Sequence, residues 1–229
     1  MAATGYFNHQ TVDFLHELTD NNNRDWFEDN KLRYENHVRG PALRFIEDMA
    51  AGIKAISPHF LVSAKKSGGS MMRVYRDTRF SKDKAPYKTN IGIQFRHERG
   101  KDVHAPGFYF HVAGDGCFLG AGIWRPDSSS LGKIRDRIDE RPGEWANARD
   151  DRNFSRRFVL SGDSLKRGPA GYPSDHPLLE DLKRKDFIAV RNLELPDIFA
   201  PNLITSVAES YATATPFMRF LCAALEVPF

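Results

Sequence analysis

The sequence predicts an α+β fold, in which helices cover one face of a mainly antiparallel sheet. Helical periodicity marks the first quarter of the chain and its C-terminal end, whereas the middle carries short alternating segments separated by turn residues. With 229 residues and 41% hydrophobic content, the chain can bury one sizeable core. We therefore expect a single domain over residues 1–229.

Helices account for the N-terminal quarter. Asn8 can cap a first helix, and a second helical segment runs from about residue 24 to 34. Gly40 and Pro41 are expected to end that segment. Pro41 also suits the first turn of a third helix, which continues to Pro58.

The pattern then changes to a period of two, which is typical of strands. Four short segments rich in aromatic and β-branched residues predict strands at 71–75, 91–97, 107–113 and 117–124. Because turn residues separate them, we expect neighbouring strands to run antiparallel.

Helical patterns return in the second half of the chain. Segments 128–140 and 174–185 are predicted helices, and they flank a further strand at 187–195. A long helical segment from about 201 to 225 closes the chain, and Pro216 is expected to split or kink it.

The two central aromatic strands predict a hairpin. Asp115-Gly116 is the expected two-residue turn, with Gly114 paired to Cys117. This register places one set of side chains on the core side: Phe108, Phe110, Val112, Leu119, Ala121 and Ile123.

The opposite side of this hairpin is predicted to form a depression. His111 lies opposite Gly120, and Tyr109 lies opposite Gly122, with Trp124 near one end. Glycines in strands mark close approach of a ligand or of another backbone. Both interpretations stay open here: the groove binds a ligand, or a helix of the protein packs into it.

Positive charge is concentrated in residues 73–88. The net charge of the whole chain is only +3, and this stretch alone exceeds it, with two acids, Asp77 and Asp83, among its bases. The bases are Arg73, Arg76, Arg79, Lys82, Lys84 and Lys88.

A strand beginning at Met72 would direct Met72 and Val74 to the core and Arg73 to the free face, together with Asp77. Arginine forks hold phosphate or carboxylate, and a neighbouring aspartate can orient the fork. The alternative is an Arg–Asp network that fixes a loop, with solvated lysines beyond it. We favour an anion site, because so many bases share two acids.

A second patch, of mixed composition, occupies residues 164–177. Lys166 and Arg167 precede a Gly/Pro loop, Tyr172 follows, and Ser174 or Asp175 is a candidate helix cap with His176 in the first turn. By itself, this pattern indicates only ordinary capping.

Several blocks of the chain together resemble the bacterial domain-of-unknown-function family numbered two-four-six-one. The signature R-x-x-R-D-x-R-F-x-x-[DN]-K-x-x-Y is matched by Arg73, Arg76, Asp77, Arg79, Phe80, Asp83, Lys84 and Tyr87. The segment from residue 21, the central hairpin and the 165–177 loop also resemble that family. The resemblance covers nearly the whole chain, but it implies no established activity, substrate or catalytic residue.

The sequence favours an enzyme or binding protein for a small phosphate- or carboxylate-bearing ligand. His111 is the candidate catalytic residue, because histidine transfers protons near neutral pH. The expected ligand-binding residues are Arg73, Arg76, Asp77, Arg79, Lys84, Tyr87, Tyr109, Trp124, Arg167 and His176.

Two other kinds of function remain as alternatives. A non-catalytic module could bind nucleic acid or an acidic partner, since aromatic side chains beside arginines can stack on bases. A structural or interaction protein is preferable if a helix fills the glycine groove.

We expect no metal and no cofactor. Cys117 and Cys222 lie among apolar residues and predict two buried thiols. Zinc-protease, P-loop and nucleophile-elbow motifs do not occur in the chain. Without a signal sequence or an apolar run of membrane-spanning length, we expect a cytoplasmic protein that does not cross a membrane.

Overall fold

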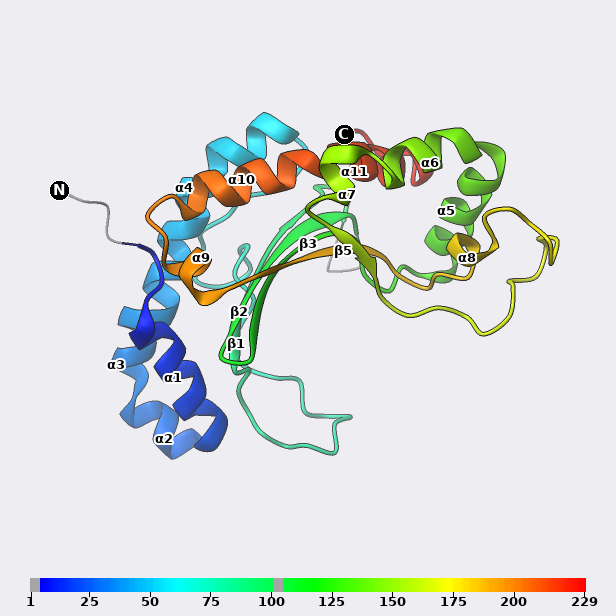
Figure 1. The fold of residues 1–229 in the computed structure, drawn as a ribbon. Coiled ribbons are helices and arrows are strands. Elements are labelled where there is room, and N and C mark those ends of the chain that lie inside the picture. Colours follow the sequence, from blue (N-terminus) through cyan, green and yellow to red (C-terminus); the bar gives the residue numbers. More distant parts are fainter. Residues whose placement is uncertain (1–4, 101–104) are drawn as a thin grey trace.

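A curved, five-stranded antiparallel sheet organises the protein (Figure 1). The computed structural model describes residues 5–100 and 105–229. Its strands follow the order β1-β2-β3-β5-β4. Their bounds are β1 Asn90–Arg96, β2 Gly107–Ala113, β3 Gly116–Ile123, β4 Val159–Ser161 and β5 Phe187–Leu193.

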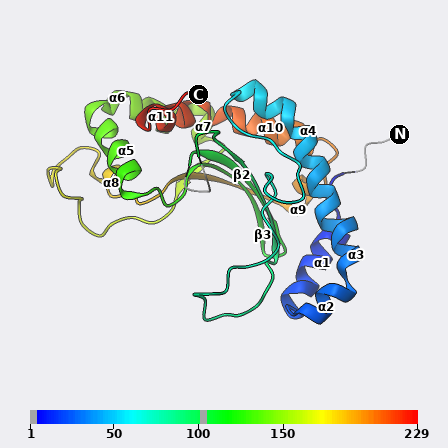
Figure 2. The same ribbon diagram turned by 180° about the vertical axis from the view of Figure 1, so that it is seen from behind.

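Helices cover the convex face of this sheet and leave the concave face open (Figures 1 and 2). The first group comprises α1 His9–Asp20, α2 Arg24–Asp29, α3 Lys31–Tyr34, the π-helix η1 Glu35–Arg39 and α4 Gly40–Ile56. The second group comprises α5 Ser128–Glu140, α6 Pro142–Arg149, α7 Arg152–Ser155, α8 Leu179–Leu182, α9 Leu195–Phe199, α10 Leu203–Thr213 and α11 Thr215–Ala224. The α+β prediction is confirmed.

The predicted break at Gly40-Pro41 is wrong. The chain passes through this dipeptide without leaving the helix, because the Gly40 N–H donates to the Glu35 carbonyl, five residues back. The wider π turn accommodates Pro41, whose ring would clash with the preceding turn of an α-helix. A Cβ atom at Gly40 would lie 2.8 Å from the Glu35 carbonyl oxygen, so this passage requires glycine.

The core face of the hairpin is as predicted. Phe110 is fully buried and stacks on Phe45 of α4 with ring centroids 4.7 Å apart. The other predicted core residues of β2 and β3 are also buried: Phe108, Val112, Leu119, Ala121 and Ile123. Cys117 and Cys222 are buried free thiols, in agreement with the sequence.

The hairpin register differs from the prediction by two residues. The turn is Gly114-Asp115, so Ala113 pairs with Gly116 and Tyr109 lies opposite Gly120. Neither turn residue has a positive φ. A Cβ atom at Gly114 would lie 2.4 Å from the exposed His16 ring of α1, so a larger residue there would require that ring to move. A shift of two preserves each side chain's face.

Two further elements differ from the sequence prediction, and a third agrees with it. Residues 71–75 form no named strand; Met71 and Tyr75 make only isolated bridges, to Ile93 and Tyr87. The predicted helix at 174–185 is reduced to α8, which begins at Leu179. Pro216 does split the C-terminal segment, since it opens α11 directly after α10.

The edge strand β4 and the helices α6 and α7 were not predicted. β4 has only three residues, too few for a visible alternation. Helix α6 lies in a segment whose apolar residues do not follow one helical face, although Trp145 is fully buried. Among the described residues, no helix is both long and apolar enough to cross a bilayer.

Candidate functional site

The open concave face contains a pocket of about 380 Å³. The alternating residues of β2 and β3 that point away from the helices line it. Its principal side chains are Met72, Gln94, Tyr109, His111, Phe118 and Trp124. In the described part of the chain, no helix contributes a residue to this lining, so the groove is not filled by one of the protein's own helices.

Tyr109, His111 and Phe118 form a connected aromatic cluster. The His111 ring stacks on Phe118 with centroids 4.5 Å apart and planes inclined by 15°. The Tyr109 hydroxyl lies 3.1 Å from His111 Nδ1, and the Asn90 side-chain nitrogen lies 3.5 Å from the same atom. Because an amide nitrogen only donates, this geometry favours Nδ1 as the acceptor and a proton on Nε2.

Burial sets the protonation of this cluster. It lowers the pKa of His111, and the more distant Asp115 carboxylate opposes this shift. The ring is therefore neutral at neutral pH, able to accept a proton or to donate from Nε2. Burial also raises the pKa of Tyr109 to about 12, so its phenol remains protonated.

The glycines leave space on this face of the sheet, and two of them, Gly92 and Gly120, make room for the Tyr109 side chain. A Cβ atom at Gly92 would lie 2.7 Å from the Tyr109 hydroxyl, and one at Gly120 would lie 3.4 Å from Tyr109 Cβ. The Tyr109 ring thus lies across the two neighbouring strands. The strand glycines do lie beside a depression, as the sequence predicted, although Tyr109 itself occupies part of that space.

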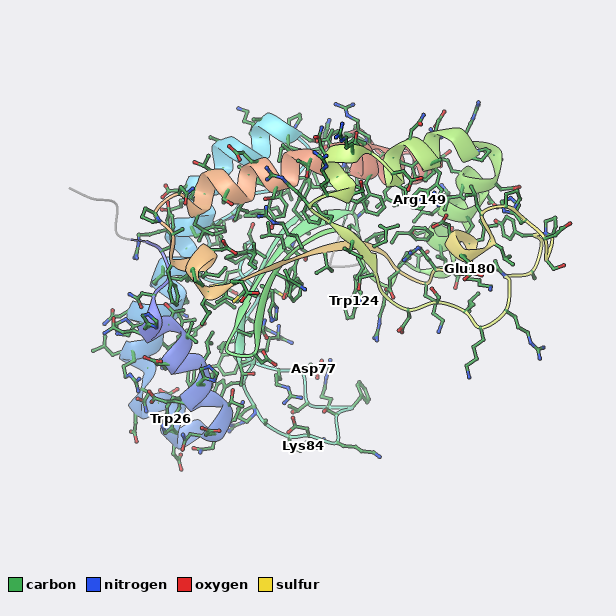
Figure 3. All side chains as sticks on the ribbon, in the orientation of Figure 1. Trp26, Asp77, Lys84, Trp124, Arg149 and Glu180 are labelled. Atoms are coloured by element: carbon green, nitrogen blue, oxygen red, sulfur yellow. The ribbon has the colours of Figure 1, made fainter. Side chains whose placement is uncertain are left out.

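Trp124 lies at the end of β3 and remains 44% exposed. The Arg125 guanidinium lies 4.7 Å from its ring centroid, in a cation–π arrangement. Arg125 has a φ of 46°, and its N–H donates to the buried Asp186 carboxylate at 2.8 Å. Figure 3 shows Trp124 on the concave side, facing the region of the loop that carries Asp77 and Lys84.

The basic segment forms a loop, residues 71–89, that projects on the concave side of the sheet (Figures 1 and 2). Within it, Arg76 pairs with Asp83 at 2.5 Å, and Arg79 makes a two-point contact with Asp77 at 2.7 and 3.0 Å. Lys84 donates to the Thr78 carbonyl at 2.8 Å. Each carboxylate thus binds one arginine within the loop, which agrees with the loop-fixing alternative.

Arg73 and Lys88 are not part of these pairs. In the segments that the structure describes, neither side chain forms a hydrogen bond or an ion pair, although the Lys88 backbone N–H donates to the Val74 carbonyl at 2.7 Å. Burial lowers the pKa of Lys88, and the Arg73 guanidinium lowers it further. Alternation back from Gly92 through Asn90 directs Lys88 toward the concave face.

Met72 points the opposite way from the prediction. It lines the concave pocket rather than the core, whereas Val74 packs against the core as expected. The reason is that Met71 pairs with the buried Ile93, so Met71 takes the core face and Met72 the opposite one; the next bridge, Tyr75–Tyr87, is out of register with the first, and Val74 in this irregular stretch is again on the core side. Simple alternation from Met72 therefore does not hold.

Tyr87 lies in the core. Its ring stacks on Phe27 of α2 with centroids 4.0 Å apart. Its backbone N–H and carbonyl both bond to the Asn22 side chain at 3.0 Å. Tyr87 therefore attaches the base of loop 71–89 to the N-terminal helices and does not face the pocket.

Arg167 and His176 lie on a second loop, residues 162–178, on another side of the molecule from loop 71–89 (Figures 1 and 2). His176 Nδ1 accepts from the Leu178 N–H, and Nε2 lies 3.0 Å from the Asp139 carboxylate of α5. Tyr172 donates to Asp136 of the same helix at 2.7 Å. The structure thus joins His176 and Tyr172 to α5, and neither they nor Arg167 line the concave pocket.

Sequence reasoning left two lining side chains, Met72 and Gln94, out of the expected site, as well as Asn90, which contacts His111. Lys88 was counted in the basic stretch but not placed in the site, although alternation from β1 indicates its face. Among the described residues, no group of three or more His, Cys, Asp or Glu side chains could hold a metal ion.

The fold and this pocket define an α+β protein with an open concave sheet face bordered by a basic loop. The chain belongs to the family described as "Conserved hypothetical protein (DUF2461)", whose model matches residues 10–220. No curated protein and no solved structure shows a significant match to the chain.

Proposed function

We propose that the concave face binds a small phosphate- or carboxylate-bearing ligand, either as an enzyme or as a binding protein. The observation that supports this most directly is the pair Arg73 and Lys88, whose charges act on each other and whose side chains form no ion pair in the described part of the chain. Like charges that approach each other at reduced solvent exposure favour binding of an anion.

The pocket and the basic pair supply complementary interactions. Tyr109, Phe118 and Trp124 offer ring faces and edges to an aromatic or apolar body. Lys88 and Arg73 would hold its anionic group, and Arg73 has the planar fork that matches two oxygens. Neutral His111, at the floor of the pocket, is the candidate for proton transfer.

The proposal reassigns part of the basic motif. Arg76, Arg79 and Asp77 shape the loop through their internal pairs, so their guanidinium groups are less available to a ligand. The proposed ligand site does not include Tyr87, which lies in the core. It also excludes Arg167 and His176, which lie on the loop of residues 162–178.

Phenyl phosphate and benzoate are suitable probes, because each joins a ring to one anionic group. We expect both to raise the melting temperature, and we expect Lys88→Gln to weaken their binding by about tenfold or more, since a hydrogen bond to a charged group contributes about 1.5–3 kcal/mol. Calorimetric titration measures the loss. Lys82→Gln is the matched control, because Lys82 is exposed and carries the same charge.

The main alternative is a nucleic-acid or acidic-partner binding module. The arginine–aromatic pairs Arg125–Trp124 and Arg79–Phe80 favour it, and Phe80 is 95% exposed. Equal losses for the two lysine variants, each decreasing as salt is added, would reject the small-ligand site and support this alternative.

A further inference from the structure

A second group of basic side chains lies at the β4 edge of the sheet. It lines a pocket of about 590 Å³. Arg156 and Arg157 come from the segment between α7 and β4, and Arg191 comes from β5. β4 pairs with β5 only as far as Val190, so Arg191 and Asn192 lie where β4 no longer covers the strand.

Two of these arginines share a single neutral partner. Arg157 Nη1 donates to Ser210 Oγ of α10 at 3.3 Å, and Arg191 Nη1 donates to the same oxygen. Ser210 is fully buried and donates its own proton to the Ser206 carbonyl at 2.6 Å. One hydroxyl oxygen therefore brings two guanidinium groups together.

Negative charge is scarce around this pair. In the described segments, none of Arg156, Arg157 and Arg191 forms an ion pair with a carboxylate. Burial lowers the pKa of Arg191, the Arg157 guanidinium lowers it further, and only the Asp197 carboxylate acts in the opposite direction. Asp197 is itself engaged, since its side chain accepts from the Glu194 N–H at 2.9 Å.

We propose that Arg156, Arg157 and Arg191 form a second binding site, specific for the phosphate group of an organic phosphate or diphosphate. Guanidinium forks match the spacing of phosphate oxygens, and two forks held together can bind more than one oxygen. Ser161 and Asn192, which also line the pocket, add neutral hydrogen-bonding groups. The volume exceeds that of one phosphate, which leaves room for the rest of such a ligand.

This site is separate from the one proposed on the concave face, although Val190 borders both pockets. The test therefore uses the full chain in a Lys88→Gln background, which weakens the first site. Inorganic phosphate and pyrophosphate are titrated calorimetrically. We expect pyrophosphate to bind, and Arg157→Gln to weaken its binding about tenfold or more.

Arg152→Gln is the matched control. Arg152 is an exposed arginine of α7, five residues before Arg157, and it does not line the pocket. We expect this variant to retain the pyrophosphate affinity of the background protein. Equal losses in the two variants, or no binding in the background protein, would overturn the proposal.

Thermal denaturation distinguishes ligand binding from a purely structural role. If Arg157 serves only to hold Ser210, then Arg157→Gln lowers the melting temperature in phosphate-free buffer. The proposed site predicts a melting temperature that is unchanged or raised there, because repulsion with Arg191 is relieved, together with loss of the stabilisation by pyrophosphate. A lowered melting temperature with pyrophosphate binding intact would refute it.

Discussion

Gly120 and Gly122 lie two positions apart on β3 and yet have different roles. Gly122 has a φ of 126°, and a Cβ atom there would lie 2.0 Å from the Phe187 carbonyl oxygen of β5. At Gly120 the nearest atom to an added Cβ is Tyr109 Cβ, at an ordinary contact distance of 3.4 Å. Gly122 is required by the backbone, whereas Gly120 keeps the pocket floor open.

Gly122→Ala should therefore destabilise the protein by about 3 kcal/mol or more, through both the left-handed φ and the clash with a backbone atom. Gly120→Ala should change the free energy of unfolding by less than about 1 kcal/mol. Urea denaturation of the two variants measures the difference. Equal stability of the two would mean that β3 and β5 do not approach as closely as described.

Ion pairs within loop 71–89 stabilise its conformation, in addition to its attachment to the N-terminal helices. The Arg79 guanidinium, which contacts both Asp77 oxygens, and the Arg79 backbone N–H hold the pKa of Asp77 at about 2. The shift is downward, so the pairing is fully present above the ordinary carboxyl pKa near 3.8 and is lost as the pH falls through about 2.

We predict that Arg79→Gln returns the Asp77 pKa toward its ordinary value, because the side-chain contact with Arg79 is the largest cause of the shift. NMR titration of the Asp77 carboxyl carbon provides the measurement. Lys82→Gln removes one charge from the same loop without touching Asp77 and should leave its titration unchanged. A wild-type Asp77 that titrates near 3.8 would contradict the described loop geometry.

The β2–β3 hairpin illustrates why the register of a strand pair is harder to predict than the face on which its side chains lie. The sequence placed the turn at Asp115-Gly116 because these residues tolerate positive φ, whereas the turn is Gly114-Asp115, without positive φ. Gly114 of this turn lies close to the His16 ring, which comes from a helix about a hundred residues earlier in the chain, and the hairpin sequence gives no indication of that contact. Because the difference is two residues, the core face was still predicted correctly.

At the scale of the whole molecule, the core joins the sheet to both the N-terminal and the C-terminal helices. Phe110 of β2 stacks on Phe45 of α4 and lies against Phe7, with ring centroids 5.9 Å apart. On the same strand, Phe108 packs on Tyr211 of α10 at 4.8 Å. Segments distant in sequence thus meet on one face of one strand.

Phe110→Ala should lower the free energy of unfolding by about 3–5 kcal/mol, the range for a fully buried aromatic side chain. Phe80→Ala is the matched control, since Phe80 is 95% exposed at the loop tip and its loss should leave stability nearly unchanged. Denaturant midpoints compare the two variants. A near-neutral Phe110→Ala would show that this side chain does not belong to the core.

The sequence by itself determined the fold class, the buried face of the hairpin and the local excess of positive charge. These features depend on periodicity and composition, which are read over short stretches of chain. It could not determine which bases remain without carboxylate partners, because Arg76 and Arg79 are neutralised by the folding of the loop on itself.

Only the tertiary structure decided the rest. The pairing of Met71 with the buried Ile93 turned Met72 toward the pocket, and stacking on Phe27 placed Tyr87 in the core. The meeting of Arg157 and Arg191 at Ser210 joins three separate segments. Such contacts link residues far apart in sequence, and local propensity and alternation carry no information about them.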